Sequence, residues 1–353
     1  MTRLWQVFSM NYLIYDKEGK RQGELQNCTS IQWKPRYNDT GTAEIHARKT
    51  PDNLKYLNSE CRIVCKERRE ILFIEDVLYN SGEIEIHGFM NNLSKRINTT
   101  THTIKNIEGD LFQLVHDNQR GLDINVPELK GIDVNIKSGS DTTYETLEAS
   151  FLEYCKQGEL GFRVLMNPLE ELNTLEIYEG RYRPRAKFSD ALGNLTNISY
   201  ERDYSQYKNY VYVLGEDSGE QRRCVVVDRH KEGEEIRELY VDARDIQSEY
   251  EDSNGNKHTY TDEEYNAMLQ ERGNSKLDEA NKSAYKFGFE LIPDNQIAVL
   301  GFDYDLGDIV PVQSVEYGVQ EKVRITGINF VEEANQDVQT TLETETYSKE
   351  VEE

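Results

Sequence analysis

The chain has 353 residues, 37% hydrophobic and 30% charged, so it can form two or three domains, although its apolar share is small for one globular body. Its formal net charge of −24 argues against sequence-specific nucleic-acid binding, which needs clustered Lys and Arg. No run approaches the roughly 18 apolar residues that cross a bilayer, and the N-terminus lacks the pattern of a secretory signal. This composition suits a thin, ring- or barrel-forming β protein.

Residues 1–100 contain short strand patterns separated by turn-rich segments at intervals of roughly 8–12 residues. Such spacing is typical of closed barrels and sandwiches rather than βαβ units, so an N-terminal β-barrel-like domain is predicted. The expected elements are a hairpin at 12–25, a strand at 28–37 broken at Pro35, and strands at 41–50, 61–67, 71–79 and 83–89.

The composition changes after about Ser94, and residues 101–185 are predicted to form an α+β domain. Its clearest helix has a capping box, Thr142 with Glu145, and a stop at Gly158. The apolar face of that helix is expected to hold Tyr144, Leu147, Phe151, Leu152 and Cys155. The predicted elements are a polar crossing at 97–106, helices at 108–118 and 142–158, a hairpin of 161–167 with 174–180, and a linker at 181–188.

Residues 186–353 return to β patterning and are predicted to form a second β-barrel-like domain. Alternating residues in 206–230 and 236–246 indicate three strands, with the acidic segment 215–220 as the connection between the first two. The last strands are expected at 287–293, 308–313, 321–330 and 337–346, followed by a frayed acidic tail.

This second domain carries a predicted insertion near 249–285. Its hairpin at 249–261 has Asn254-Gly255 at the tip, a strong turn signal. The helix at 261–280 opens with a capping box of Thr261 and Glu264, and Gly273 is expected to weaken its middle. Its buried stripe is predicted to be Tyr265, Met268, Leu269 and Leu277. The expected class is therefore β-rich α+β, with two β-barrel-like domains and α+β insertions.

Two segments resemble chemical motifs without completing them. GEDSG (215–219) is similar to the nucleophile segment of trypsin-like proteases, but no matching histidine motif exists and a hairpin turn explains Ser218 better. Residues 252–263 place oxygen ligands at several EF-hand positions, although Lys257 stands where glycine is needed and no helix precedes the loop. The oxygen-bearing residues are Asp252, Asn254, Asn256 and Glu263.

Paired ionisable residues give no stronger signal. His46 and His87 occupy matching offsets in two strands, where polar positions on a strand face are a simpler explanation than a metal pair. Neighbours such as Glu234 and Glu235 arise by chance among 65 acidic residues. The 22 tyrosines and 11 phenylalanines fit core packing and interfaces as well as a carbohydrate groove.

The five cysteines are odd in number and widely scattered, so reduced, buried thiols are predicted in the absence of a secretory signal. Cys61 and Cys65 fall on one face of a strand, and no second pair completes a zinc site. The others are Cys28, Cys155 and Cys224. We therefore expect no catalytic, cofactor-binding or metal-binding residues, no cofactor, and no enzyme activity.

Seven segments of the chain share one further property, their order. They are 30–45 (SIQWKPRYNDTGTAEI), the helix 142–158 leading into 160–164 (LGFRV), 175–183 (LEIYEGRYR), 195–216, 237–246 (RELYVDARDI), the helix 261–280, and 301–312 (GFDYDLGDIVPV). In this collinear order they resemble the siphophage tail-hub family, also called tail-associated or minor structural tail proteins. The resemblance covers roughly residues 10–345.

The resemblance implies two β-barrel hub domains with α+β insertions, similar to the baseplate hub of contractile phages. It implies a structural subunit whose three copies form a ring at the tail tip and line the DNA channel. The implied partners are the distal tail protein ring, the tape measure protein, and receptor-binding or tip proteins. The implied location is the virion, with the host cytoplasm during assembly. Relatives often continue into a lysin or receptor-binding extension, which is expected to lie on another chain here.

Two other classes stay open. A carbohydrate- or receptor-binding tail module would show exposed aromatic residues on one face, and a tail-associated cell-wall hydrolase would have a cleft with a nucleophile or paired carboxylates. The acidic balance also has two explanations. It either repels DNA from the wall of a channel or keeps free subunits soluble before assembly.

Overall fold

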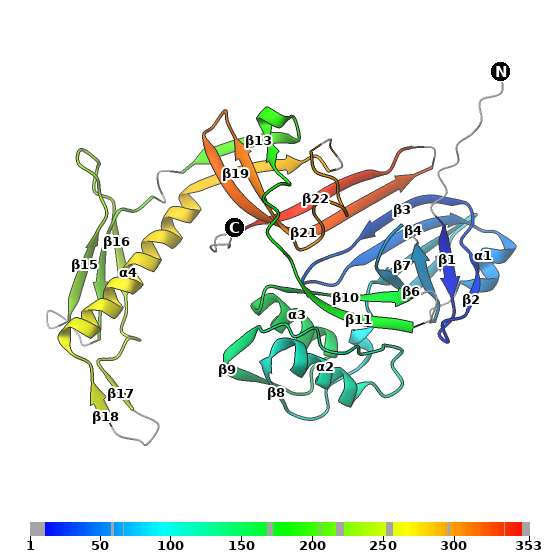
Figure 1. Cartoon of the computed structure of the whole chain (residues 1–353), viewed down its shortest axis with the longest axis horizontal. Coiled ribbons are helices and arrows are strands. Elements are labelled where there is room, and N and C mark those ends of the chain that lie inside the picture. The colour runs from blue at the N-terminus through cyan, green and yellow to red at the C-terminus, as the bar shows by residue number, and fades with distance from the viewer. Residues whose placement is uncertain are drawn as a thin grey trace. The chain divides into compact units, whose positions relative to one another are not determined.

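The computed structural model describes residues 11–57, 60–65, 67–167, 172–203, 205, 207–216, 222–251, 257–293, 295, 297–334 and 336–347 (Figure 1). Strands far outnumber helices in these residues, which confirms the expected β-rich α+β class. The chain divides into two compact units, Met1–Thr196 with Glu290–Glu353, and Asn197–Phe289. The expected boundaries at residues 100 and 185 both fall inside the first unit.

One eleven-stranded sheet dominates the first unit, with the path β12-β20-β21-β3-β4-β7-β6-β5-β1-β2 and β22 paired to β21. The β3–β21 pairing joins the N-terminal strands to the C-terminal ones, through register pairs such as Trp33 with Phe330. No pairing closes this sheet into a barrel among the described strands. The strands are β1 (Tyr12–Tyr15), β2 (Arg21–Glu24), β3 (Cys28–Lys34), β4 (Thr42–Arg48), β5 (Arg62–Cys65), β6 (Ile71–Tyr79), β7 (Glu83–Phe89), β12 (Phe188–Ser189), β20 (Ile309–Ser314), β21 (Val319–Glu333) and β22 (Gln339–Thr346).

The N-terminal strands follow their sequence patterns closely. In β4, Ala43, Ile45 and Ala47 are buried while the residues between them face outward, as period-two alternation requires. The predicted hairpin of β1 with β2 is confirmed, and β3 ends at Lys34, one residue before Pro35. The sequence analysis missed a short helix, α1 (Pro51–Tyr56), which begins with the Thr50 side chain accepting a hydrogen bond from the Asn53 amide.

The two helices and the hairpin of the α+β part share an apolar core with residues of β1, β5 and β6, such as Leu13, Val64 and Phe73. The predicted helix at 108–118 and the predicted hairpin are confirmed, and β10 and β11 pair without interruption. The segment 97–106, expected to be a crossing, contains a strand that pairs with β9. The elements are η1 (Leu93–Lys95), β8 (His102–Asn106), α2 (Ile107–Asn118), β9 (Asn135–Thr142), α3 (Leu147–Gln157), β10 (Leu160–Asn167) and β11 (Leu172–Glu179).

Helix α3 begins later than predicted. Its N-cap is Thr146, whose hydroxyl accepts from the Ala149 amide at 3.1 Å, and it ends at Gly158 as expected. Thr142 instead ends β9, where it pairs with His102, so strand pairing takes precedence over the predicted capping box. Tyr144 is 77% exposed with φ of +54°, and is not part of the helix face.

The second unit contains a three-stranded sheet with the order β15-β14-β16 and one long helix, α4. β14 pairs antiparallel with β15 and parallel with β16, which confirms three strands in 206–246. In Figure 1, α4 runs along this sheet, and its predicted stripe packs on the sheet's valines. The elements of this unit are β14 (Tyr210–Leu214), β15 (Cys224–Asp228), β16 (Glu238–Asp242), β17 (Glu249–Glu251), β18 (Lys257–Thr259) and α4 (Asp262–Ala284). β13 (Leu195–Arg202) and β19 (Tyr285–Leu291) each belong partly to both units, and η2 (Asp190–Leu192) belongs to the first.

The capping box and the hairpin predicted for this unit are confirmed within the residues that the structure describes. Thr261 and Glu264 exchange hydrogen bonds as a capping box, at 2.8 Å and 3.2 Å. β17 and β18 form the predicted hairpin, while its tip at 254–255 lies outside the described residues, as do most of the 215–220 connection and the tail beyond Tyr347. None of the helices that the structure describes has both the length and the apolar character needed to cross a bilayer.

Gly273 has a packing role that its sequence position did not indicate. A Cβ atom at Gly273 would lie 2.7 Å from Val213 and 2.9 Å from Val227, both in the sheet beneath α4. We expect Gly273→Ala to destabilise the second unit by roughly 1–3 kcal/mol, because the steric cost exceeds the gain in helix propensity. Hydrogen exchange of peptides from 262–284 should accelerate accordingly. Ser275→Ala, at an exposed position of the same helix, is the matched control and should leave exchange unchanged or slower.

Candidate functional site

The two motif-like segments do not form chemical sites in the described residues. Ser218 lies outside the described residues, as do Asp252, Asn254 and Asn256. Glu263 is exposed in the first turn of α4, and Lys257 begins β18. Glu234 is occupied by the Tyr207 hydroxyl and the Lys231 amide. Glu235 pairs with Arg237 at 3.1 Å.

All five cysteines are free thiols. Cys61 and Cys65 lie in the core of the N-terminal strands, on the same side as Ile63, as alternation predicted. Burial raises the pKa of Cys65 to about 12 and favours the neutral thiol. The expectation that every cysteine is buried is wrong for Cys224, which lies on the exposed face of β15, and for Cys28, which is half-buried at the start of β3.

His46 and His87 lie on the outward face of neighbouring strands β4 and β7. Each ring nitrogen Nε2 contacts a carboxylate of its own strand, Glu44 at 2.9 Å and Glu85 at 2.7 Å. The hydrogen bond to Glu44 raises the pKa of His46 above its usual value. Both histidines therefore lie on a strand face, and each has at least one carboxylate beside it.

Tyr37, which follows β3, makes hydrogen bonds to several segments of the first unit. Its amide donates to the Thr326 carbonyl of β21, and its carbonyl accepts from the Phe162 amide of β10, both at 3.0 Å. Its hydroxyl donates to the Glu159 carbonyl and accepts from the Gly180 amide, both at 2.8 Å. One residue thus links the N-terminal strands, the β10–β11 hairpin and the C-terminal strands.

The Tyr37 ring is fully buried, and two glycines make room for it. A Cβ at Gly161 would lie 2.4 Å from the ring, and one at Gly307 would lie 2.2 Å from it. Gly307 also has φ of +91°, a conformation that favours glycine. A Cβ at Gly180 would lie only 1.7 Å from the Gly307 carbonyl oxygen. Burial raises the pKa of Tyr37 to about 12, so its hydroxyl remains a neutral donor and acceptor.

Arg324 of β21 completes this group, which we call the Tyr37 junction: Tyr37, Glu159, Gly161, Gly180, Gly307 and Arg324. The Arg324 guanidinium donates to the Gly307 carbonyl at 2.9 Å and to the Glu159 carboxylate at 3.0 Å. Its Cζ lies 5.2 Å from the centre of the Tyr37 ring. The junction is therefore a packed and hydrogen-bonded contact among three chain segments.

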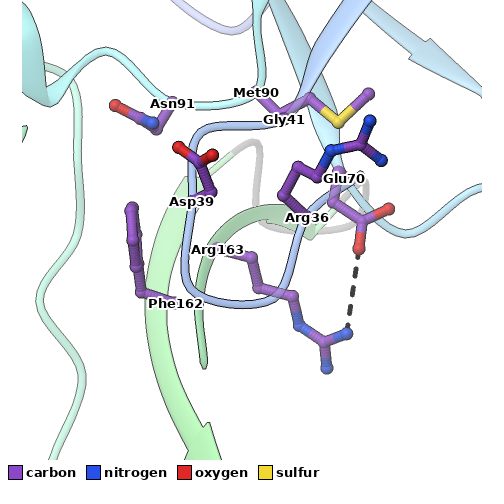
Figure 2. A pocket seen from close by; sticks show the side chains of 8 residues that line it. All are labelled: Arg36, Asp39, Gly41, Glu70, Met90, Asn91, Phe162 and Arg163. Atoms are coloured by element: carbon purple, nitrogen blue, oxygen red, sulfur yellow. Dashed lines mark ion pairs between the residues drawn. The ribbon is translucent and has the colours of Figure 1, made fainter. Parts of the chain in front are cut away.

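A second buried charge cluster lies beside the junction, around Arg163 of β10. Figure 2 shows Arg163 directed toward Glu70, and the two are 3.8 Å apart. Arg163 also donates to Glu176 at 2.5 Å and lies 4.3 Å from the Tyr178 ring centre. Burial raises the pKa of Glu70 above its usual value despite Arg163. Burial opposes ionisation of Glu176 too, but Arg163 and Lys130 outweigh it and lower the pKa of Glu176.

Two hollows adjoin these clusters. The one in Figure 2, lined by Glu70 and Arg163 among others, measures about 10 Å³, room for a single water molecule. The other is an open cleft of about 530 Å³ beside the junction. It is lined by Gly158, Glu159, Glu179, Gly180, Tyr182, Ile309, Arg324 and Tyr347. These lining residues include no Ser, Cys or His that could act as a nucleophile or base, and the Glu159 carboxylate is hydrogen-bonded to Arg324. A Ser–His–Asp or Cys–His arrangement is therefore absent from this lining.

The sequence analysis missed the Tyr37 junction, although it had marked the segments that meet there. Tyr37 belongs to 30–45, and the three glycines belong to 160–164, 175–183 and 301–312. Single glycines next to β-patterned residues were treated as turn markers. A glycine beside a strand can also mark a place where another side chain approaches the backbone closely, and this signal could have indicated the junction.

Two solved structures that share the fold of this chain are phage tail proteins. The tail protein from Neisseria meningitidis MC58 matches with a TM-score of 0.50 at 14% identity, over 95% of this chain and 96% of that one. A prophage tail protein from Listeria monocytogenes EGD-e matches with a TM-score of 0.50 at 12% identity, over 97% of this chain and 95% of that one. At these identities the likeness concerns the fold alone, which is that of a phage tail protein.

The family follows from the sequence match. The model described as Siphovirus ReqiPepy6 Gp37-like protein matches residues 11–98 and 122–343, well over half of the chain. The chain therefore belongs to this siphophage tail protein family, which confirms the resemblance identified from the seven segments. A comparison with curated proteins finds no match. As a phage tail protein, the chain is a structural component of the virion.

Proposed function

We propose that this protein is the structural hub subunit at the tail tip. Three copies form a ring that joins the distal tail ring to the tip and lines the DNA channel. The observation that carries this proposal is the family match, which extends over both the N-terminal and the C-terminal strands. Similarity to two phage tail proteins over nearly their full lengths supports it.

The architecture is compatible with two barrel-like hub domains. One apolar core gathers around Trp33, Ile45 and Ile63, and a second lies between the α+β part and side chains of β1, β5 and β6. We propose that residues 1–100, 101–185 and 186–353 are three evolutionary modules, of which the first and the third are barrel-like. Neighbouring subunits would complete the barrels in this proposal, because the edge strands β2 and β12 have free edges among the described pairings.

The proposed partners are the distal tail protein ring, the tape measure protein, and receptor-binding or tip proteins. Assembly would take place in the host cytoplasm before incorporation into the virion. The net charge of −24 fits a subunit that stays soluble until assembly and that does not capture DNA passing along the ring. A channel role predicts that the acidic residues lie mainly on the inner wall.

The proposal includes no enzymatic role. The open cleft beside the Tyr37 junction holds an arginine–carboxylate pair within reach of Tyr182 and Tyr347, an arrangement suited to packing and partner contact. Carbohydrate or receptor binding and cell-wall hydrolysis remain the alternative functions. Neither alternative function requires a ring with a fixed number of copies. The number of copies per particle therefore distinguishes the hub from both alternatives.

The expected result is a homotrimer. Light scattering on the purified chain should give three times the 41.1 kDa chain mass, or purified tails should contain three copies per particle by quantitative mass spectrometry. The second measurement covers a ring that forms only with its partners. A monomer in solution together with a different copy number in tails would contradict the proposal. Turnover of cell-wall substrate by the purified chain would favour the hydrolase instead.

A further inference from the structure

A block of alternating histidines and glutamates lies on the outer face of β4 and β7. Glu44 is directly opposite His87, and His46 is directly opposite Glu85. Because the intervening residues of both strands are buried, these four side chains share one outward face. Directly opposite residues have Cβ atoms about 5 Å apart, so the four functional groups can meet.

Three of these side chains bring potential metal ligands together. One ligand atom each from Glu44, His46 and Glu85 lies within 4.8 Å of the others. His46 Nε2 is 2.9 Å from Glu44 Oε1, and the three side chains are 25%, 37% and 24% exposed for His46, Glu44 and Glu85. The group is thus open on one side to solvent and closed on the other by the sheet.

A third carboxylate, that of Glu83, lies beside the other ring nitrogen of the histidine. Glu83 Oε2 lies 3.7 Å from His46 Nδ1, an ion-pair distance. Glu83 is itself held by the Thr29 hydroxyl, which donates to its Oε1 at 3.0 Å. Metal-ligating histidines usually have their second ring nitrogen next to a carboxylate in this way, which keeps the proton on Nδ1 and leaves Nε2 free to coordinate.

We propose that Glu44, His46 and Glu85 form a site for a divalent first-row transition-metal ion, with Zn²⁺ as the probe. An imidazole with two carboxylates suits such ions, whereas Mg²⁺ and Ca²⁺ prefer oxygen ligands alone. Tetrahedral zinc with bonds of about 2.0 Å needs ligand atoms about 3.3 Å apart. The Glu44 and His46 ligand atoms, 2.9 Å apart, would separate by a few tenths of an ångström, and rotation of the Glu85 side chain would bring its oxygen to the same distance. Water, or His87, would fill the open position.

The competing explanation is a surface charge pattern with no ion. Opposite charges placed across strands stabilise a sheet on their own. The two explanations differ in the role of Glu83. A metal site needs the Glu83 carboxylate beside Nδ1 of His46, whereas in a charge pattern the ion pair of His46 with Glu44 suffices. The pair of His116 with Asp117 on α2, 3.2 Å apart, shows the simpler case of one histidine with one carboxylate.

The test is calorimetric titration of the untagged full chain with ZnCl₂. We expect one ion per chain, unaffected by millimolar MgCl₂. CoCl₂ should give visible absorption bands that added ZnCl₂ removes. His46→Gln and Glu85→Gln should each weaken binding at least tenfold, and Glu83→Gln roughly tenfold, because it acts by positioning His46. His116→Gln is the matched control and should bind as the wild type does.

A folding readout accompanies the titration. Zinc should raise the melting temperature of the wild type, since an ion that binds only the folded state stabilises it, and the rise should be absent in His46→Gln. If His46→Gln does not fold, Glu85→Gln and Glu83→Gln decide the matter. Absence of stoichiometric binding would overturn the proposal. Equal binding by the wild type and all three variants would also overturn it, because the ion would then lie elsewhere. The outcome is independent of the trimer test.

Discussion

Replacing Tyr37 by alanine is expected to lower the free energy of unfolding of the first unit by about 3–5 kcal/mol, the range for removing a large buried aromatic side chain. The change opens a cavity beside Gly161 and Gly307, and neither glycine has a side chain that could fill it. It also leaves the Gly180 amide and the Glu159 carbonyl without the hydroxyl that they share. Three chain segments would lose their common contact at once.

The measurement is denaturant unfolding followed by tryptophan fluorescence. Both tryptophans of the chain, Trp5 and Trp33, precede residue 197, so the signal reports on the first unit alone. Tyr37→Phe keeps the ring and should cost about 1–3 kcal/mol for the unsatisfied amide. Tyr144→Phe, at a 77% exposed tyrosine, is the control and should change stability by less than about 0.5 kcal/mol. Equal stabilities for Tyr37→Phe and the wild type would show that the hydrogen bonds of the hydroxyl contribute nothing.

The sequence predicted those features whose cause is local. The capping box of Thr261 with Glu264 and the hairpin of β10 with β11 need only neighbouring residues, and both are present. The capping box predicted at Thr142 failed because the same residue pairs in β9, a contact with a strand about 40 residues away. A local signal was correct where no distant partner competed with it.

The candidate sites could not be predicted in the same way. At Gly273 and at Gly161, a side chain from a distant segment occupies the space that a Cβ atom would fill. A single sequence does not show which side chain that is. His46 and Glu85 become neighbours only through the register of β4 with β7. The order of seven segments nevertheless identified the family, because that resemblance does not depend on knowing how the segments pack together.

The second large effect is expected at Arg163. Arg163→Met keeps most of the side-chain volume and removes the charge, which leaves the 9% exposed Glu70 carboxylate without its ion-pair partner. Breaking a buried pair from one side costs about 3–5 kcal/mol, so we expect a loss near the lower end, since Glu176 retains Lys130. Lys17→Met removes a surface pair with Glu60, 3.2 Å apart and more than half exposed, and should leave the stability close to that of the wild type.

The dependence of this loss on pH identifies its cause. A carboxyl whose folded-state pKa is raised contributes stability that is present below its unfolded pKa and is lost as pH rises through the folded pKa. Burial already raises the pKa of Glu70, and removing Arg163 removes the interaction that opposes the rise. The stability deficit of Arg163→Met should therefore be largest at neutral pH and shrink as pH falls toward 4.5, measured by the same fluorescence unfolding. Adding Glu70→Gln should recover at least about 1.5 kcal/mol at pH 7 and flatten the pH dependence, as expected for coupled neighbours. The stability deficit could instead stay constant with pH in both the single and the double variant. Arg163 would then stabilise the hairpin through its stacking on Tyr178 and its bond to Glu176, and not through the charge of Glu70.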